Sequence, residues 1–126
     1  MKKEFEEIVR LAKELSWDTT VNEEFDKEYE ETYSIVTFEL IKPYQLDFNF
    51  TVEAENNSVY SLLDNLAHYL SAYDVSEETY LHLDEQGHGK KGYPYDMEEV
   101  LKIFKYREDE ISKLVEHLTN NYEEEN

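Results

Sequence analysis

The segment from Leu46 to Ala54 constrains the fold most, because its side chains alternate strictly between apolar and polar. The apolar set is Leu46, Phe48, Phe50, Val52 and Ala54, and the polar set is Asp47, Asn49, Thr51 and Glu53. A period of two is typical of a β-strand with one buried face and one solvated face. We therefore expect a sheet that carries a second layer on its apolar side.

A second strand is predicted just before this segment, over Tyr33–Ile41, where β-branched and aromatic residues are frequent. Val36, Phe38 and Leu40 fall on one side of it. The residues between the two segments, Lys42–Gln45, include a proline and predict a turn. Together the two strands form an antiparallel hairpin with one buried face.

Three helices are predicted, over residues 3–15, from a cap within residues 56–58 to about Tyr73, and from Asp96 onward. Their apolar stripes are Phe5, Ile8, Val9, Ala12 and Leu15; Val59, Leu62, Leu63, Leu66, Leu70 and Tyr73; and Met97, Val100, Leu101, Phe104, Ile111, Leu114, Val115 and Leu118. The last stripe has a polar gap at Arg107 and Glu108. At the start of that helix we expect a capping box between Asp96 and Glu99 and a hydrophobic staple between Tyr95 and Val100.

Two segments stay ambiguous. Residues 75–83 fit a third strand, because Thr79, Leu81 and Leu83 alternate, or a short helix capped by Ser76. Residues 16–31 contain Trp17 and Val21, which could start a strand, but an acidic run poor in core residues follows. We interpret residues 16–31 as loop or edge structure.

The expected architecture is a two-layer α+β fold, with an antiparallel β-hairpin or three strands packed against two to three α-helices. With 126 residues in the chain, we expect a single domain over residues 1–120. We predict a disordered acidic tail over residues 121–126. The oligomeric state stays open.

The charge of the chain restricts its partners. It has 12 Lys+Arg against 31 Asp+Glu, a net charge of −19. Direct binding to nucleic acid is excluded, because phosphates would be repelled. No apolar run could span a membrane and the N-terminus lacks a secretory signal, so the expected location is the cytoplasm. Solubility needs a net charge of only about 2–8 in a small domain, so the excess indicates a basic partner protein.

The candidate site is the densest acidic stretch before the C-terminal tail, residues 22–31, in which six acids stand against Lys27 alone. The predicted partner-binding residues are Glu23, Glu24, Phe25, Asp26, Glu28, Tyr29, Glu30 and Glu31. Their carboxylates would replace phosphates against Arg and Lys, and the aromatic side chains would anchor the interface. The alternative interpretation is a solvated face that keeps the protein soluble.

Catalytic and metal-binding patterns are weak. His82, Asp84 and His88 could approach a metal ion, but their spacing matches no zinc motif. The glycine-rich loop over residues 87–92 lacks the ending of a P-loop, so we interpret it as a turn-forming loop. With no cysteine and no recognisable catalytic constellation, we predict no metal, no cofactor and no enzymatic activity.

Part of the chain resembles a group of known proteins. The segments LLDNLAHYLSAYDVSEE, GHGKKGYPYD and DMEEVLKIFKYREDEISKLVEHL, within residues 57–118, resemble small acidic accessory proteins encoded by phages and conjugative elements of Gram-positive bacteria. The resemblance implies a counter-defence role, of the anti-restriction or anti-CRISPR type, and carries over no functional residue.

We expect a DNA-mimic-like inhibitor that occupies the basic nucleic-acid-binding surface of a host defence nuclease. The alternative is an immunity or antitoxin protein that neutralises a basic nuclease toxin. A small hydrolase or metal-dependent enzyme is the third hypothesis, for which no constellation is found.

Overall fold

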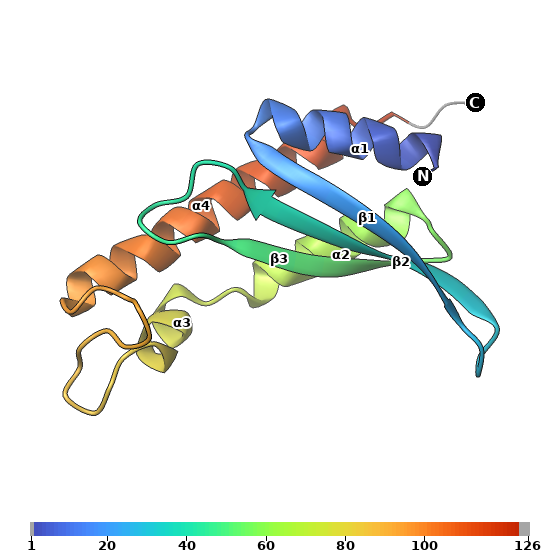
Figure 1. Ribbon diagram of the computed structural model, residues 1–126. Coiled ribbons are helices and arrows are strands. Elements are labelled where there is room, and N and C mark those ends of the chain that lie inside the picture. The colour runs from blue at the N-terminus through green and yellow to red at the C-terminus, as the bar shows by residue number, and fades with distance from the viewer. Residues whose placement is uncertain (1, 124–126) are drawn as a thin grey trace.

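The computed structural model describes residues 2–123, which contain a three-stranded antiparallel sheet and four α-helices (Figure 1). In chain order the elements are α1 (Lys3–Glu14), β1 (Trp17–Asp26), β2 (Glu31–Leu40), β3 (Asn49–Glu55), α2 (Val59–Ala72), α3 (Val75–Leu81) and α4 (Met97–Asn121). The strand order is β1-β2-β3, so β1 and β3 are the two edges. The predicted α+β fold, with helices packed on the sheet, is confirmed.

The hairpin of β2 and β3 is present as predicted, although β3 starts three residues late. The two strands pair from Tyr33 opposite Glu55 to Glu39 opposite Asn49. Leu46 and Phe48 lie in the connection instead, where Gln45 has a positive φ of 64°. Phe48 still serves the core, because its ring packs on Phe50 with 5.9 Å between the ring centroids.

The third strand, β1, lies within residues 16–31 at one edge of the sheet. Of the two structures predicted for this segment, the edge strand is therefore correct and the loop is wrong. β1 pairs with β2 along its whole length, from Trp17 opposite Leu40 to Asp26 opposite Glu31. Only its first half carries core residues: Trp17 is fully buried, Val21 half-buried and Phe25 56% exposed. Figure 1 shows why, because the β1–β2 hairpin extends past the helices.

Residues 75–83 are not the third strand. Residues 75–81 form helix α3, and the cap is Asp74 rather than Ser76, because the Asp74 carboxylate accepts a hydrogen bond from the Glu77 N–H at 3.0 Å. The apparent alternation of apolar residues was misleading, since Leu81 is 54% exposed and Thr79 is buried. The side chain of Thr79 bonds the Val75 carbonyl at 2.7 Å within the helix.

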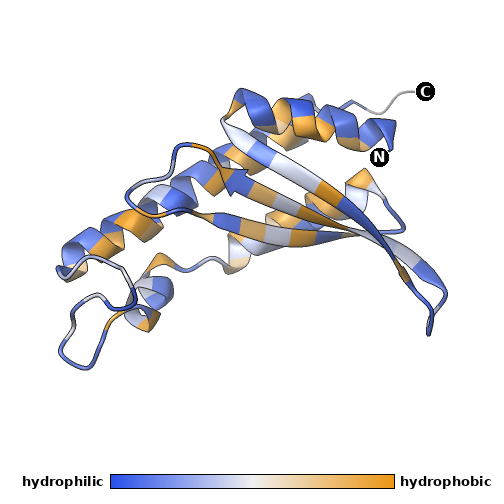
Figure 2. Ribbon diagram, viewed as in Figure 1, coloured by the Kyte–Doolittle hydropathy of each residue, from blue (hydrophilic) through white to orange (hydrophobic). Residues whose placement is uncertain are grey.

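The core lies between the helices and one side of the sheet. Phe50 is its centre, because its ring stacks on Tyr69 of α2 at 4.3 Å and on Phe38 of β2 at 5.4 Å between centroids. Figure 2 shows the apolar residues alternating along the strands and forming stripes on the helices. In Figure 1, α2 and α4 lie behind the sheet, and no described helix covers its other side.

The start of α4 differs from the prediction. Asp96 caps the helix through the Glu98 N–H at 3.1 Å, but the Glu99 side chain bonds Lys102 at 3.0 Å, so the capping box is wrong. Tyr95 is 71% exposed and stacks on His88 with 3.7 Å between centroids, so its ring is not packed in a staple with Val100.

The polar gap in the α4 stripe is filled by a buried arginine. Arg107 is 6% exposed, and its guanidinium donates hydrogen bonds to the Tyr93 hydroxyl at 3.1 Å and the Asp47 carbonyl at 3.3 Å. It also lies over the rings of Phe48 and Phe104, 4.7 and 5.0 Å from their centroids. Aromatic faces attract a cation, so this end of the core tolerates the charge. Two residues of the predicted stripe, Met97 and Leu101, are exposed instead.

The C-terminal end of α4 reaches the boundary predicted for the tail. Asn121 is the last residue of the helix and Tyr122 is its C-cap. The Tyr122 ring packs edge-on against Tyr60 of α2, with 6.3 Å between centroids. The last part of the expected tail, residues 124–126, lies outside the described residues.

Candidate protein-binding face

The uncovered side of the sheet is acidic. Because side chains alternate along each strand and the register is continuous, fourteen residues of the three strands point to this side. Seven of them are acids and none is a lysine or an arginine. We call these seven residues the acidic face: Asp18, Glu24 and Asp26 on β1, Glu31 and Glu39 on β2, and Glu53 and Glu55 on β3.

The charge density of the acidic face reaches that of duplex DNA. With strands about 4.8 Å apart and about 6.7 Å between alternate residues, each position covers about 32 Å². Seven acids in fourteen positions therefore give one charge per about 64 Å². Duplex DNA, taken as a cylinder of about 10 Å radius, carries one phosphate per about 100 Å². The net charge of the chain, averaged over its 8096 Å² surface, would not reach this density.

Most acids of the acidic face form no ion pair within residues 2–123. Asp18 forms an ion pair with Lys13 of α1, with 2.8 Å between Nζ and Oδ1, in which both side chains are more than half exposed. The other six acids form no ion pair with any basic side chain among residues 2–123. Their charge is therefore available to a partner.

Two larger side chains lie in the middle of the acidic face. Tyr33 and Ile35 of β2 are both half-buried, and each is flanked by residues of β1 and β3. Glu24 and Glu55 lie on the two sides of Tyr33, while Asn22 and Glu53 lie beside Ile35. An aromatic ring enclosed by carboxylates can receive an arginine in two ways, through stacking and through ion pairing.

A shallow hollow of about 330 Å³ lies at the hairpin end of this side of the sheet. It is lined by Asp26, Glu31, Thr32, Tyr33, Glu53, Glu55 and Asn56. Four of these seven residues are acids of the acidic face. The hollow has the size and charge to receive cationic side chains.

The residues predicted from the sequence do not form one surface. Glu24, Asp26 and Glu31 belong to the acidic face, whereas Glu23 and Phe25 point to the helix side of the sheet, beyond the helices. The remaining three, Glu28, Tyr29 and Glu30, lie in the turn between β1 and β2. The structure therefore separates the predicted site into three parts.

The turn at the hairpin tip is ordered by Asp26. Its Oδ1 accepts hydrogen bonds from the backbone N–H of Glu28 at 2.9 Å and of Tyr29 at 3.4 Å. This Asx turn leaves Glu30 with a positive φ of 52° and the Tyr29 ring 67% exposed. One acid of the acidic face thus also fixes the shape of the tip.

Sequence reasoning missed five residues of this surface, which are Asp18, Tyr33, Glu39, Glu53 and Glu55. A partial signal existed, because the polar alternation of Asn49, Thr51 and Glu53 already places these residues on the solvated side of a strand. The register that aligns them with β1 was not visible in the sequence. Their proximity follows only from the three-stranded pairing.

His82 is a packing residue. His82 bonds the Glu78 carbonyl at 2.7 Å through Nδ1, and its ring lies against Tyr93 and Phe104, with 4.5 and 4.9 Å between centroids. Among residues 2–123 no group of three or more His, Asp or Glu side chains is arranged to hold a metal ion.

The glycine-rich loop uses its own backbone N–H groups. Asp84 accepts hydrogen bonds from the N–H groups of Gln86 at 2.9 Å and His88 at 3.0 Å, which lowers the pKa of its carboxyl. The Gly89 N–H bonds the Tyr95 carbonyl at 3.2 Å, and a Cβ at Gly89 would lie 1.8 Å from the Pro94 oxygen. These donors are engaged, so the loop does not offer them to a phosphate.

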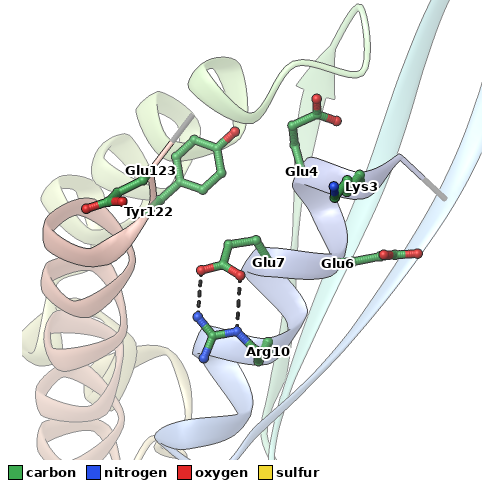
Figure 3. Close-up of a pocket in the computed structure, with 7 residues that line it drawn as sticks. All are labelled: Lys3, Glu4, Glu6, Glu7, Arg10, Tyr122 and Glu123. Atoms are coloured by element: carbon green, nitrogen blue, oxygen red, sulfur yellow. Dashed lines mark hydrogen bonds and ion pairs between the residues drawn. The ribbon is translucent and has the colours of Figure 1, made fainter. Parts of the chain in front are cut away.

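A groove of about 420 Å³ lies between α1 and the end of α4 (Figure 3). Its lining is charged, and Arg10 donates hydrogen bonds of 2.6 and 3.1 Å to the two oxygens of Glu7. This arginine lowers the pKa of the Glu7 carboxyl. The acid and base neutralise each other, so the pair offers neither a proton nor a nucleophile.

Comparisons with protein families, with curated proteins and with solved structures find no match to this chain. Among the described residues, no helix has the length and apolar character needed to cross a membrane.

Proposed function

We propose that this protein is an inhibitor that places its acidic face on the basic nucleic-acid-binding surface of another protein. The partner we expect is a defence nuclease of a bacterial host, either a CRISPR effector or a restriction enzyme. This is a binding function and not an enzymatic one, and its expected place of action is the cytoplasm.

The observation that carries the proposal is the charge density of the acidic face. Its carboxylates are held by paired strands at a density equal to or above that of DNA phosphates. A surface that evolved to bind phosphates presents Arg and Lys at matching density, and carboxylates accept the same charge-assisted hydrogen bonds. The acidic face therefore competes with nucleic acid for those side chains.

The proposed mechanism begins with long-range attraction. A net charge of −19 steers the molecule toward a basic surface and raises the association rate constant. Contact then desolvates Tyr33 and the acids around it, which supplies the short-range part of the binding energy. Since salt screens the first step, the association rate constant should fall steeply as ionic strength rises.

The test is displacement of a fluorescent DNA duplex from a panel of purified nucleases: a CRISPR effector, a restriction endonuclease and a nuclease toxin. Fluorescence anisotropy would report release of the DNA as the protein is added. The acidic-face variant carries five changes: Glu24→Gln, Asp26→Asn, Glu31→Gln, Glu53→Gln and Glu55→Gln. A matched control neutralises five exposed acids elsewhere: Asp64→Asn, Glu77→Gln, Glu85→Gln, Glu98→Gln and Glu116→Gln.

Both variants change the net charge from −19 to −14, so they differ only in where the charge is lost. We expect the wild type and the control to displace DNA from at least one nuclease, and the acidic-face variant to need at least ten times the concentration. Equal loss in the two variants would contradict the proposal, because it would mean that net charge and not the acidic face decides. Absence of displacement across the panel would contradict it as well.

A further inference from the structure

The two edges of the sheet differ in how they are closed. On β3, the Asn65 side chain of α2 donates a hydrogen bond to the Glu53 carbonyl at 2.6 Å. The Ser61 hydroxyl, also on α2, accepts one from the Glu55 N–H at 2.9 Å. Two outward backbone groups at the C-terminal end of β3 are thus occupied by a helix that packs on that strand, so a further strand cannot pair along that part of the edge.

The edge of β1 is open. The Ile41 N–H donates to the Ser16 carbonyl at 2.9 Å, and this pair continues the register of β1 and β2. Because hydrogen-bonded and non-bonded pairs alternate in an antiparallel ladder, the even-numbered residues of β1 bond to β2. The odd-numbered residues, including Thr19, Val21 and Glu23, turn their N–H and C=O groups outward. No residue among 2–123 outside the β1–β2 ladder bonds these groups.

A groove runs beside the first half of this edge, between β1 and α1. Its volume is about 590 Å³, and it is lined by Glu6, Val9, Arg10, Lys13, Glu14, Trp17, Asp18 and Thr19. Two of these residues carry buried polar atoms with no hydrogen-bond partner among the described residues, the Trp17 Nε1 and the Thr19 Oγ1. Both atoms are buried, so an added strand would bond the backbone groups at the edge and not these two side chains.

We propose that the open edge of β1 accepts an extended basic segment of the partner protein as a fourth strand. This inference rests on the proposed function and adds to it the mode of binding. The backbone of the segment would bond the outward groups of Thr19, Val21 and Glu23, and its side chains would alternate between the two sides of the sheet.

Charge decides what the added strand must be. On the acidic face, every second residue of the segment faces an even-numbered residue of β1, and three of these five are the acids Asp18, Glu24 and Asp26, which favours Lys or Arg there. On the other side, the neighbours include the half-buried Val21 and the 56% exposed ring of Phe25, which favour an apolar residue, with the exposed Glu23 between them. A segment that alternates basic and apolar residues fits both sides.

A second copy of this chain does not fit. Two β1 strands paired antiparallel about a two-fold axis would keep their acidic sides together. With the axis at Asn22, for example, Asp18 of one copy lies opposite Asp26 of the other. Like charges directly opposite each other destabilise a sheet, so pairing between the β1 strands of two copies is disfavoured.

The probe is a synthetic nine-residue peptide of alternating Lys and Val. Its first control has the same sequence with N-methyl groups on the residues that would donate to β1, which removes the hydrogen bonds and keeps the charge. Its second control alternates Glu and Val. Binding is measured by isothermal titration calorimetry, and amide hydrogen exchange is followed by NMR at Thr19, Val21 and Glu23, with Thr20 and Asn22 as internal references that already bond to β2.

We expect the Lys–Val peptide to slow exchange at the three odd-numbered residues at least tenfold, with little change at the two references. N-methylation should weaken binding at least tenfold, about 1.4 kcal/mol. The Glu–Val peptide should not bind. Equal affinity of the methylated and parent peptides, or no binding of the parent, would overturn the inference.

A pair of protein variants provides a second test. Glu23→Pro removes one outward N–H, and an edge strand tolerates a proline at such a position. Glu23→Gln removes the same charge and keeps the N–H. Binding of the Lys–Val peptide should be at least fivefold weaker in Glu23→Pro than in Glu23→Gln. Equal binding would count against strand addition. The acidic-face function is judged separately by the DNA displacement experiment, which uses neither the peptides nor these variants.

Discussion

Glu24 on β1 lies directly opposite Tyr33 on β2, so a carboxylate and a phenol ring are cross-strand neighbours on the uncovered side of the sheet. Their Cβ atoms are therefore about 5 Å apart. Glu55 flanks the same ring from β3. This trio is the element of the acidic face that differs most from a merely soluble surface, because it combines charge with an aromatic anchor of the kind found at interface centres.

The first prediction uses the acidic run over residues 22–31, in which neighbouring acids point to different places. Glu24→Gln/Asp26→Asn/Glu31→Gln removes three charges from the acidic face. Glu23→Gln/Glu28→Gln/Glu30→Gln removes three from the helix side and the turn. We expect the first triple variant to raise the concentration for half-displacement of DNA at least tenfold, about 1.4 kcal/mol, and the second to raise it less than threefold.

Anisotropy titrations on one nuclease compare the two triple variants directly, since their net charge is equal. Equal effects of the two variants would show that only the number of charges in the run matters for DNA displacement, and not the side of the sheet on which they lie. Circular dichroism of both variants checks that the sheet remains folded.

β1 shows where sequence reasoning loses information. A strand is recognised by its buried alternation, and in β1 only Trp17, Thr19 and Val21 have the helix layer over them. Beyond them Glu23 and Phe25 occupy inward positions that nothing covers. The second half of β1 is held in place by its pairing with β2. The local sequence pattern of β1 cannot reveal this pairing, because β2 lies on the other side of a turn. The hairpin of β2 and β3 was predictable because both of its strands keep a buried side along most of their length.

The second prediction concerns the core. Phe50 is 6% exposed and contacts four aromatic rings, of Trp17, Phe38, Phe48 and Tyr69. Phe50→Ala should lower the free energy of unfolding by about 3–5 kcal/mol, because it leaves a cavity between the sheet and α2. Urea denaturation followed by fluorescence measures the change. A loss below about 1 kcal/mol would show that the sheet and α2 are not packed as described.

The third prediction concerns alkaline pH. Burial raises the pKa of Tyr69 to about 12 and that of Tyr73 further, from an ordinary value of 10.0. Between pH 10 and about 12, the two tyrosines keep their protons in the folded protein and release them in the unfolded chain. The free energy of unfolding therefore falls as pH rises through this interval. Tyr69→Phe removes one of these groups, so this variant should lose less stability over the same interval.

Urea midpoints at pH 9, 10, 11 and about 12 measure this difference. Tyr80→Phe serves as control, because the Tyr80 ring is 77% exposed and its hydroxyl lies outside the core. A decline in Tyr69→Phe as steep as in the wild type would contradict the assigned burial of this hydroxyl.

The fourth prediction concerns Arg107, which the sequence places as an interruption of a helical stripe. Arg107→Ala should lower the free energy of unfolding by about 2–4 kcal/mol, because the Tyr93 hydroxyl and the Asp47 carbonyl lose a charged donor and the rings around it lose contacts. Arg107→Lys should recover only part of this loss, since an ammonium cannot form the same fork. Lys102→Ala on the exposed side of α4 is the control and should leave the urea midpoint unchanged. Equal midpoints for Arg107→Ala and the wild type would contradict the buried position.

Arg107 also explains why part of α4 was not predictable. A charged residue within an apolar stripe normally indicates a solvated turn of the helix, and only three-dimensional packing brings Phe48, Tyr93 and Phe104 around it. The same holds for the acidic face, whose members come from three strands separated by up to 37 positions in the sequence (Asp18 to Glu55). Local composition revealed that acids were in excess, but their assembly depends on register.

The closed edge of β3 sets a limit on assembly. A sheet with two open edges can add strands without end, which leads to filaments. Here the side chains of Asn65 and Ser61 occupy the C-terminal end of the β3 edge, whereas β1 has no such contacts from residues 2–123 along its outward groups. Strand addition is therefore directed to β1, and each copy of this protein takes up one such segment at that edge.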